Sequence, residues 1–186
     1  MTLAHLKENP SHLSAQNFRS LLQAMAMPGT IETLVTFQKP TGLSDAMAAT
    51  LLTLCDAETN LFLADTYHND EIKQWVGFHL NAPITSAQDA DFFIGSWKDL
   101  EEKPSVKTGT DQFPDRSATF IIDVSKLENT GLRLTGPGIK SHSFLSLPNA
   151  KPFTENQKSF PLGNDYYFCF ENHIAAISRT TFVEDL

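Results

Sequence analysis

The sequence predicts an α/β fold in which a single domain, residues 1–186, holds a mixed β-sheet flanked by helices. Three observations lead to this class. In the first half of the chain, helical segments alternate with short apolar strands, which is typical of βαβ units. The second half is rich in strand-like segments separated by turns, which favours antiparallel additions to the sheet. An apolar content of 41% over 186 residues is enough to fill one continuous core.

The first helix and the first strand follow from local signals. Ser14 is expected to cap a helix that ends before Pro28-Gly29, because the apolar residues between them follow an i, i+3, i+4, i+7 spacing. The segment 31–37 is rich in β-branched residues and therefore predicts a strand. A second helix is expected to begin after Ser44 and to run through Leu52.

The remaining elements follow from the spacing of apolar residues. In the middle of the chain, the pattern predicts a buried strand at 60–64, a helix at 70–79, a strand at 90–94 and a short polar helix at 97–102. The second half is expected to be mainly β-structure. Its predicted strands are 117–124, 131–135, 143–147, 165–170 and 173–177.

Charge and composition indicate which partners are not expected and in which compartment the protein is expected. The 22 acidic and 14 basic residues give a net charge of -8 without a basic block, which argues against binding to nucleic acid or to an anionic membrane surface. No apolar run approaches the ~20 residues that a membrane helix needs, and residues 1–10 do not resemble a signal peptide. Cys55 and Cys169 lie in apolar runs and are expected to pack as thiols. A cytoplasmic protein is expected.

The glycine-rich segment 136–141 follows a predicted strand, as a phosphate-binding P-loop does. It departs from that motif because no Lys-Ser/Thr pair follows the second glycine directly and because Pro137 removes a backbone donor. Two interpretations remain. The segment is either a tight turn imposed by glycine and proline, which is favoured, or a loop whose backbone N–H groups contact an anion.

Metal and nucleophile signatures are weak. His5, Glu8 and His12 would share one face of an N-terminal helix, but Pro10 is expected to break that helix, so no metal site is predicted. No Gly-x-Ser-x-Gly elbow and no Cys-His signature is present, and no lysine carries a cofactor signature. The residues alone therefore identify no catalytic group and no cofactor.

The run Ser178-Arg179-Thr180-Thr181 follows a predicted strand directly. An arginine beside two hydroxyl groups is a typical set for binding a phosphate or a carboxylate. An equally favoured interpretation is that Arg179 pairs with an acidic neighbour and fixes the end of the chain.

Six stretches along nearly the whole chain carry a resemblance to a known family. They are Phe18-Arg19 with 24–30, 51–56 with Glu58-Thr59, Phe113-Pro114-Asp115 with Ser117-Ala118-Thr119, 136–139, Phe160-Pro161-Leu162-Gly163 with Asp165, and Arg179-Thr180-Thr181. In this order they resemble the PhnH family of the bacterial carbon-phosphorus lyase system. The chain departs from the family pattern at Ser178, where the family has proline, at Asn164, where it has a hydrophobic residue, and at Leu80-Asn81, where it has Thr-Gly.

The resemblance implies a function that composition and spacing do not reveal. It implies an accessory or assembly subunit, acting with the G, I and J subunits, in an assembly that transfers a phosphonate to the ribose of ATP and displaces adenine. It also implies a homodimer when the subunit is isolated, and a core similar to that of pyridoxal-phosphate-dependent transferases without the cofactor. It assigns no catalytic residue.

Two hypotheses follow for the residues that carry the resemblance. In the first, the turns around Gly136 and Phe160 shape a partner-binding face, which predicts an exposed apolar patch. In the second, Arg179 and the Gly136 turn contact the triphosphate or the phosphonate, which predicts a concave pocket. An independent pyridoxal-phosphate enzyme is the weakest alternative, because fold does not carry function. The candidate binding residues are Gly136, Pro137, Gly138, Phe160, Pro161, Gly163, Asp165, Arg179, Thr180 and Thr181.

Overall fold

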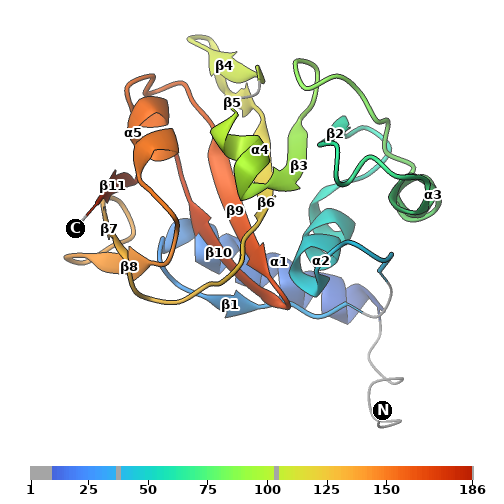
Figure 1. Cartoon of the computed structure of the whole chain (residues 1–186), viewed down its shortest axis with the longest axis horizontal. Coiled ribbons are helices and arrows are strands. Elements are labelled where there is room, and N and C mark those ends of the chain that lie inside the picture. The colour runs from blue at the N-terminus through green and yellow to red at the C-terminus, as the bar shows by residue number, and fades with distance from the viewer. Residues whose placement is uncertain (1–9, 37–38, 103–104, 186) are drawn as a thin grey trace, which may run out of the picture.

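A mixed six-stranded β-sheet forms the centre of the computed structural model, which describes residues 10–36, 39–102 and 105–185 (Figure 1). Across the sheet, the strands lie in the order β1 (Glu32–Thr33), β10 (His173–Ile177), β9 (Asp165–Phe170), β6 (Thr119–Asp123), β3 (Phe92–Ser96) and β2 (Leu61–Leu63). Strands β9, β6, β3 and β2 are parallel, and β10 is antiparallel to both β9 and β1. The predicted α/β class with a mixed sheet is therefore confirmed.

Helices pack on both faces of this sheet. Those that contact it are α1 (Pro10–Ala26), α2 (Asp45–Leu54), α4 (Trp97–Glu101) and α5 (Lys151–Gln157). On β9, the Tyr167 hydroxyl donates to the Leu21 carbonyl of α1 at 3.3 Å, whereas the Tyr166 ring packs edge-on against Phe153 of α5. Because successive side chains of a strand point to opposite faces, α1 and α5 lie on opposite sides of the sheet.

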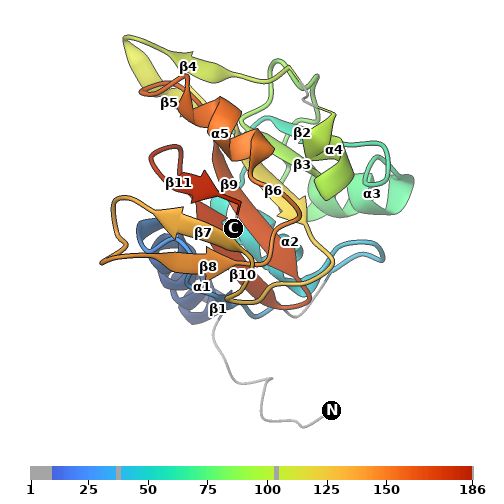
Figure 2. The same ribbon diagram turned by 60° about the vertical axis from the view of Figure 1, so that its left-hand side comes forward.

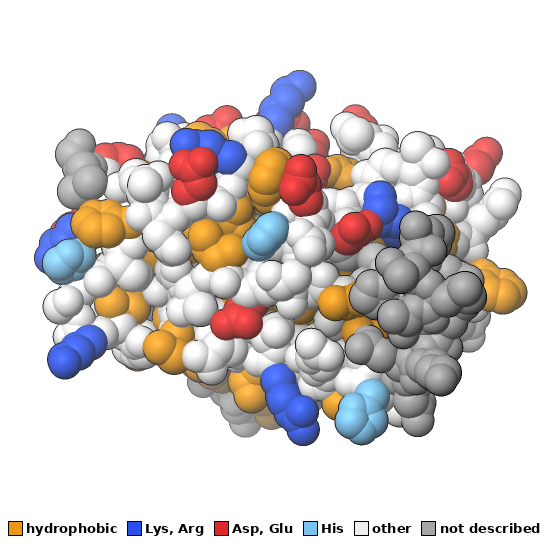
Figure 3. All heavy atoms as spheres, turned by 90° about the horizontal axis from the view of Figure 1, so that it is seen from below, with side chains coloured by type: hydrophobic (Ala, Val, Ile, Leu, Met, Phe, Trp, Pro, Cys, Tyr) orange, Lys and Arg blue, Asp and Glu red, His pale blue; other side chains and the backbone are white. Residues whose placement is uncertain are grey.

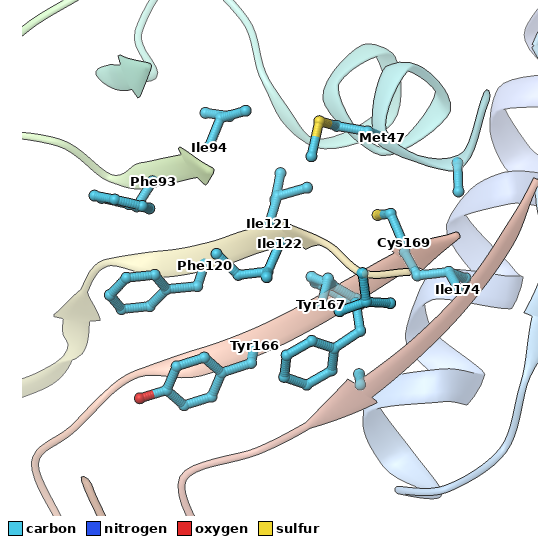
Figure 4. Packing of buried hydrophobic residues seen from close by; sticks show 14 of the residues in the cluster. Met47, Phe93, Ile94, Phe120, Ile121, Ile122, Tyr166, Tyr167, Cys169 and Ile174 are labelled. Atoms are coloured by element: carbon cyan, nitrogen blue, oxygen red, sulfur yellow. The ribbon is translucent and has the colours of Figure 1, made fainter. Parts of the chain in front are cut away.

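The hydrophobic core follows the same alternation (Figure 4). Met47 of α2 lies on the side of the sheet to which Ile121 and Cys169 point, and all three are fully buried. On the other side, the rings of Phe120 and Tyr166 stack with centroids 5.1 Å apart. The parallel strands are thus apolar on both faces, which is why they read as continuous apolar runs in the sequence.

Two helices of the first half begin where their capping residues predict. The Ser44 side chain accepts a hydrogen bond from the Met47 N–H at the start of α2. Helix α3 (Asp70–His79) has the predicted bounds, and the Asn69 side chain accepts from the Ile72 N–H at its start. Each cap satisfies a backbone donor that has no partner inside the helix.

The N-terminal part of the fold differs from the prediction in two respects. Helix α1 begins at Pro10, so Ser14 lies inside it instead of capping it. A proline is compatible with a first helical turn because the N–H that it lacks would have no intrahelical partner there. The expected strand at 31–37 is reduced to β1. Asn17 accounts for the shortness of this strand. Its side chain donates to the Val35 carbonyl and accepts from the Val35 N–H, so these two backbone groups bind a side chain instead of a neighbouring strand.

Two smaller sheets complete the fold, and part of them was not predicted. One contains β11 (Phe182–Glu184), β7 (Leu132–Thr135) and β8 (Ser143–Leu145), with β7 in the centre. The other is the hairpin of β4 (Thr108–Thr110) and β5 (Phe113–Ser117), which projects beyond the main sheet (Figure 2). The sequence prediction missed α5, β4 and β5, which are short and mostly polar, and β11, which has only three residues.

Three further observations concern membrane-spanning helices, surface charge and the cysteines. In the described part of the chain, no helix is long and apolar enough to cross a membrane. Acidic and basic side chains are interspersed on the face shown in Figure 3, without a continuous basic area among the atoms that are coloured there. Cys55 and Cys169 are both buried free thiols.

Candidate functional site

Strand pairing brings together three segments that are far apart in the sequence. The Gly136 turn (136–139) follows β7, and the segment 178–181 lies between β10 and β11. Because β11 pairs with β7 and aligns Phe182 with Thr135, these two segments leave the small sheet side by side. The segment 160–163 connects α5 to β9, whose neighbour β10 leads directly into 178–181. The candidate residues from all three segments therefore lie in one region.

At the base of this region, Arg179 forms an ion pair with Asp165. The Arg179 Nη2 lies 2.6 Å from Asp165 Oδ2, and Nε lies 3.3 Å from Oδ1. The Arg179 backbone N–H donates to the same Oδ1 at 2.8 Å. The two side chains are only 15% and 23% exposed. This two-pronged geometry fits a guanidinium to a carboxylate, and its partial burial strengthens the attraction.

The remaining donors of Arg179 bind strand β5. Nη1 donates to the Pro114 carbonyl, and Nη2 donates to Ser117 Oγ at 2.7 Å. All three guanidinium nitrogens thus have partners within the chain. Arg179 therefore joins the β4–β5 hairpin to β9; the ion pair with an acidic residue was one of the two interpretations of the sequence, whereas the link to the hairpin was not predicted.

The hydroxyl groups beside Arg179 are also engaged locally. Ser178 Oγ lies 2.8 Å from Thr180 Oγ1 and 3.0 Å from Thr181 Oγ1, and the Thr181 N–H donates to the Ser178 carbonyl. Thr181 is 2% exposed, whereas Thr180 is half-buried. These contacts form a compact turn, so Ser178 serves here as the hydrogen-bonding centre of that turn.

The Gly136 turn is seated on the C-terminal end of α1. The Ile139 N–H donates to the Gly136 carbonyl at 3.1 Å, and Gly138 has a φ of 80°. A Cβ atom at Gly138 would lie 1.9 Å from the Ala26 carbonyl oxygen. Glycine is therefore required at position 138 by both conformation and space, which supports the interpretation of a tight turn.

The third segment is held by its backbone and exposes its side chains. The Gly163 N–H donates to the Thr108 carbonyl at 3.0 Å, and a Cβ atom at Gly163 would lie 2.7 Å from Asn156 Oδ1. Phe160 is 60% exposed, and Pro161, to which it is joined by a cis peptide bond, is also exposed. Gly163 therefore fixes the backbone, while Phe160 and Pro161 are available for contacts.

Between these segments lies a cleft with a volume of about 560 Å³. It is lined by four of the predicted residues, Pro137, Phe160, Arg179 and Thr180. No carboxylate is among its described lining residues, although Asp165 lies behind Arg179. The structure thus places the candidate residues in two layers, with Asp165, Thr181 and the glycines supporting the backbone and Pro137, Phe160, Arg179 and Thr180 facing the cleft, whereas Pro161 is exposed outside its lining.

Sequence reasoning missed three further residues of the cleft: Gln157, Lys158 and Phe182. Gln157 and Lys158 lie at the end of α5, whose signals were only a proline in its first turn and one buried aromatic residue, Phe153. Phe182 lies on β11, where exposed and buried residues alternate. That alternation belongs to the folded strand, because Phe182-Val183-Glu184 does not alternate between apolar and polar residues, so the sequence gives no signal for this wall of the cleft.

The described residues provide little for nucleophilic or metal chemistry. Burial raises the pKa of the Cys55 thiol to about 12, so it is protonated and inert near neutral pH. Among the described residues, no group of three or more His, Cys, Asp or Glu side chains could hold a metal ion. Of the N-terminal histidine and carboxylate set, His5 and Glu8 lie outside the described residues.

Comparisons with known proteins match this chain over most of its length. A sequence model of the family described as bacterial phosphonate metabolism protein (PhnH) matches residues 7–184. The chain is 32% identical over 182 residues to alpha-D-ribose 1-methylphosphonate 5-triphosphate synthase subunit PhnH of Rhizobium meliloti (strain 1021), which covers 90% of this chain and 88% of the relative. It is 30% identical over 175 residues to the putative C-P lyase subunit protein HtxG of Stutzerimonas stutzeri, with 89% and 83% covered. The chain therefore belongs to the PhnH family of bacterial phosphonate metabolism proteins.

Proposed function

We propose that this protein is an accessory or assembly subunit of a carbon-phosphorus lyase complex in phosphonate catabolism. In that role it supports the transfer of a phosphonate to the ribose of ATP with displacement of adenine. Two relatives support the proposal, because one is named as a subunit of the ribose 1-methylphosphonate 5-triphosphate synthase and the other as a putative C-P lyase subunit.

The observation that carries an assembly role is the exposed aromatic lining of the cleft. Phe160 is 60% exposed and Phe182 is 53% exposed, although both are large apolar side chains. Aromatic residues that remain exposed around a concave surface are typical of the centre of a protein interface. They would be covered when a partner binds.

The alternative is a ligand-binding or catalytic subunit that contacts the triphosphate or the phosphonate through Arg179 and the Gly136 turn. The concave shape of the cleft favours it. The hydrogen bonds of Arg179 weigh against it, because the guanidinium is already bound to Asp165, Ser117 and a backbone carbonyl. Releasing it toward a ligand would leave a half-buried carboxylate without its partner.

Several finer predictions belong to this proposal. The partners are the G, I and J subunits, and the isolated protein is expected to form a homodimer, because a surface meant for partners tends to find a substitute. The protein is expected to act in the cytoplasm, as one domain over residues 1–186 and without a cofactor. The likeness of its core to pyridoxal-phosphate-dependent transferases also stays a prediction.

The experiment that tests the proposal combines co-purification with an activity assay. The tagged protein is co-expressed with the G, I and J subunits, and adenine release from ATP and methylphosphonate is measured with and without it. The expected result is that the protein co-purifies with the other subunits and that adenine release depends on its presence. Absence from the complex, together with unchanged adenine release, would contradict the proposed function.

A second arm separates assembly from ligand contact. Arg179→Lys keeps the positive charge but loses the two-pronged geometry, and it is compared with wild type for both complex formation and adenine release. An assembly subunit should lose both in proportion, because the surface near Arg179 is altered. Loss of adenine release in complexes that form normally would favour the ligand-binding alternative.

A further inference from the structure

Among the described residues that line the cleft, Lys158 is a cation without an ion-pair partner. The Lys158 ammonium group has no ion-pair partner within the described residues, whereas Arg179, the other cation of the cleft, is bound to Asp165. The Thr180 hydroxyl is bound to Ser178, and the Gln157 amide donates to the Thr181 carbonyl at 3.5 Å. The cleft therefore presents an apolar wall with a single uncommitted positive charge at its edge.

This combination determines which chemistry fits. A nucleoside triphosphate carries several negative charges and needs several donors, as phosphate-binding loops provide. The cleft has one such group, and its two exposed phenylalanines provide apolar contact area instead. An apolar side chain with one neighbouring carboxylate satisfies both features, because burial of the aromatic surface stabilises the contact and Lys158 provides charge complementarity.

We propose that the cleft receives a segment of a partner subunit that presents an apolar side chain next to an aspartate or a glutamate. The apolar side chain packs on Phe160 and Phe182, and the carboxylate binds Lys158. This inference rests on the proposed function, since it assigns that function's partner contact to one cleft.

Photo-cross-linking tests the occupant directly. Phe182 is replaced by p-benzoylphenylalanine in the protein co-expressed with the G, I and J subunits, and the cross-linked peptide is identified by mass spectrometry. The expected product is a peptide of one partner subunit with Asp or Glu within two residues of the cross-link. A cross-link only to a second copy of this chain, or to a segment without a carboxylate, would overturn the proposal.

Variants then test the energetic role of the cleft. Phe160→Ala combined with Phe182→Ala, and separately Lys158→Glu, should each lower retention in the complex at least about tenfold, as expected for residues at an interface centre. Phe78→Ala is the matched control, because Phe78 is 85% exposed and lies on α3, which does not line the cleft. Thermal unfolding confirms that each variant is folded, and Lys158→Glu changes only an exposed side chain.

The outcomes separate this inference from the proposed function. If wild type joins the complex and the cleft variants join it equally well, this inference fails and the assembly role remains. If wild type does not join the complex, the proposed function itself fails. The last measurement is a competition between ATP and the cross-link. If ATP blocks the cross-link in the intact complex at the concentration used for the activity assay, the cleft binds a small molecule and the peptide proposal is overturned.

Discussion

Arg179 Nη2 lies 2.6 Å from Asp165 Oδ2, and this ion pair joins the end of β10 to the start of β9. Pairs of this kind differ from surface pairs because removing one partner leaves the other half-buried and uncompensated. The same guanidinium also binds β5, so one side chain fixes three segments. The stability of the whole cleft region should therefore depend on Arg179.

Arg179→Ala should lower the free energy of unfolding by about 3 kcal/mol, because Asp165 and the Pro114 carbonyl lose their donor. Urea unfolding measures this change. Arg133→Ala is the control, since the Arg133–Glu184 pair has a similar distance of 2.9 Å but side chains that are 41% and 59% exposed. It should cost no more than about 1 kcal/mol. Equal effects of the two substitutions would show that Arg179 is not a structural anchor.

Gly138→Ala should destabilise the protein by about 3 kcal/mol or more, because the new Cβ would lie 1.9 Å from the Ala26 oxygen at a positive φ. Thermal or urea unfolding is the measurement. Gly77→Ala offers the opposite case within α3, where a Cβ would meet nothing within 4 Å. It should stabilise the protein by about 0.5 to 1 kcal/mol. A neutral Gly138→Ala would mean that the turn does not rest on α1.

Asn164→Leu should cost about 2 kcal/mol, although it introduces the hydrophobic residue of the family pattern at this position. The buried Asn164 amide donates to the carbonyls of Lys107 and Ala118, at 2.7 Å each. Leucine would leave both without this donor. Asn164→Asp controls for size, since it keeps the shape and removes the amide donors, and it should also destabilise. The free energy of unfolding is measured for each variant. An unchanged value for Asn164→Leu would contradict the structural role of the Asn164 amide.

The three tyrosines should ionise only when the protein unfolds. Burial raises the pKa of Tyr67, Tyr166 and Tyr167, that of Tyr167 to about 12, against about 10 in an unfolded chain. The folded state thus retains protons that the unfolded state releases, so this stabilisation is present below about pH 10 and is lost as the pH rises toward 12. Above about pH 10, each tyrosine should lower the free energy of unfolding by up to about 1.4 kcal/mol per pH unit.

Absorbance at the tyrosinate band during an alkaline titration measures this behaviour. The folded protein should show little tyrosinate at pH 10.5, where the protein in urea should be more than half ionised. Tyr166→Phe should reduce the final amplitude by about a third, because the chain has three tyrosines. A gradual titration centred near pH 10 in the folded protein would show that the rings are accessible.

Much of the architecture was predictable because local signals and the buried pattern agree. The helix at 70–79 and the strands at 165–170 and 173–177 were predicted with their observed bounds, since caps, periodicity and a turn at Glu171-Asn172 all indicate the same structure. The order of motifs also predicted the family. In each case the information lies within a few neighbouring residues or in the linear order of the chain.

The tertiary structure alone decided where the candidate residues lie and which of them are available for binding. The partners of Arg179 are 14 and 62 or more positions away in the sequence, and nothing local distinguishes a buried pair with Asp165 from an open anion site. The cleft exists because β11 pairs with β7, a contact between segments almost 50 residues apart that brings Phe182 beside the Gly136 turn. Such long-range pairing depends on the whole sheet and on burial, so periodicity and capping signals in the sequence do not reveal it.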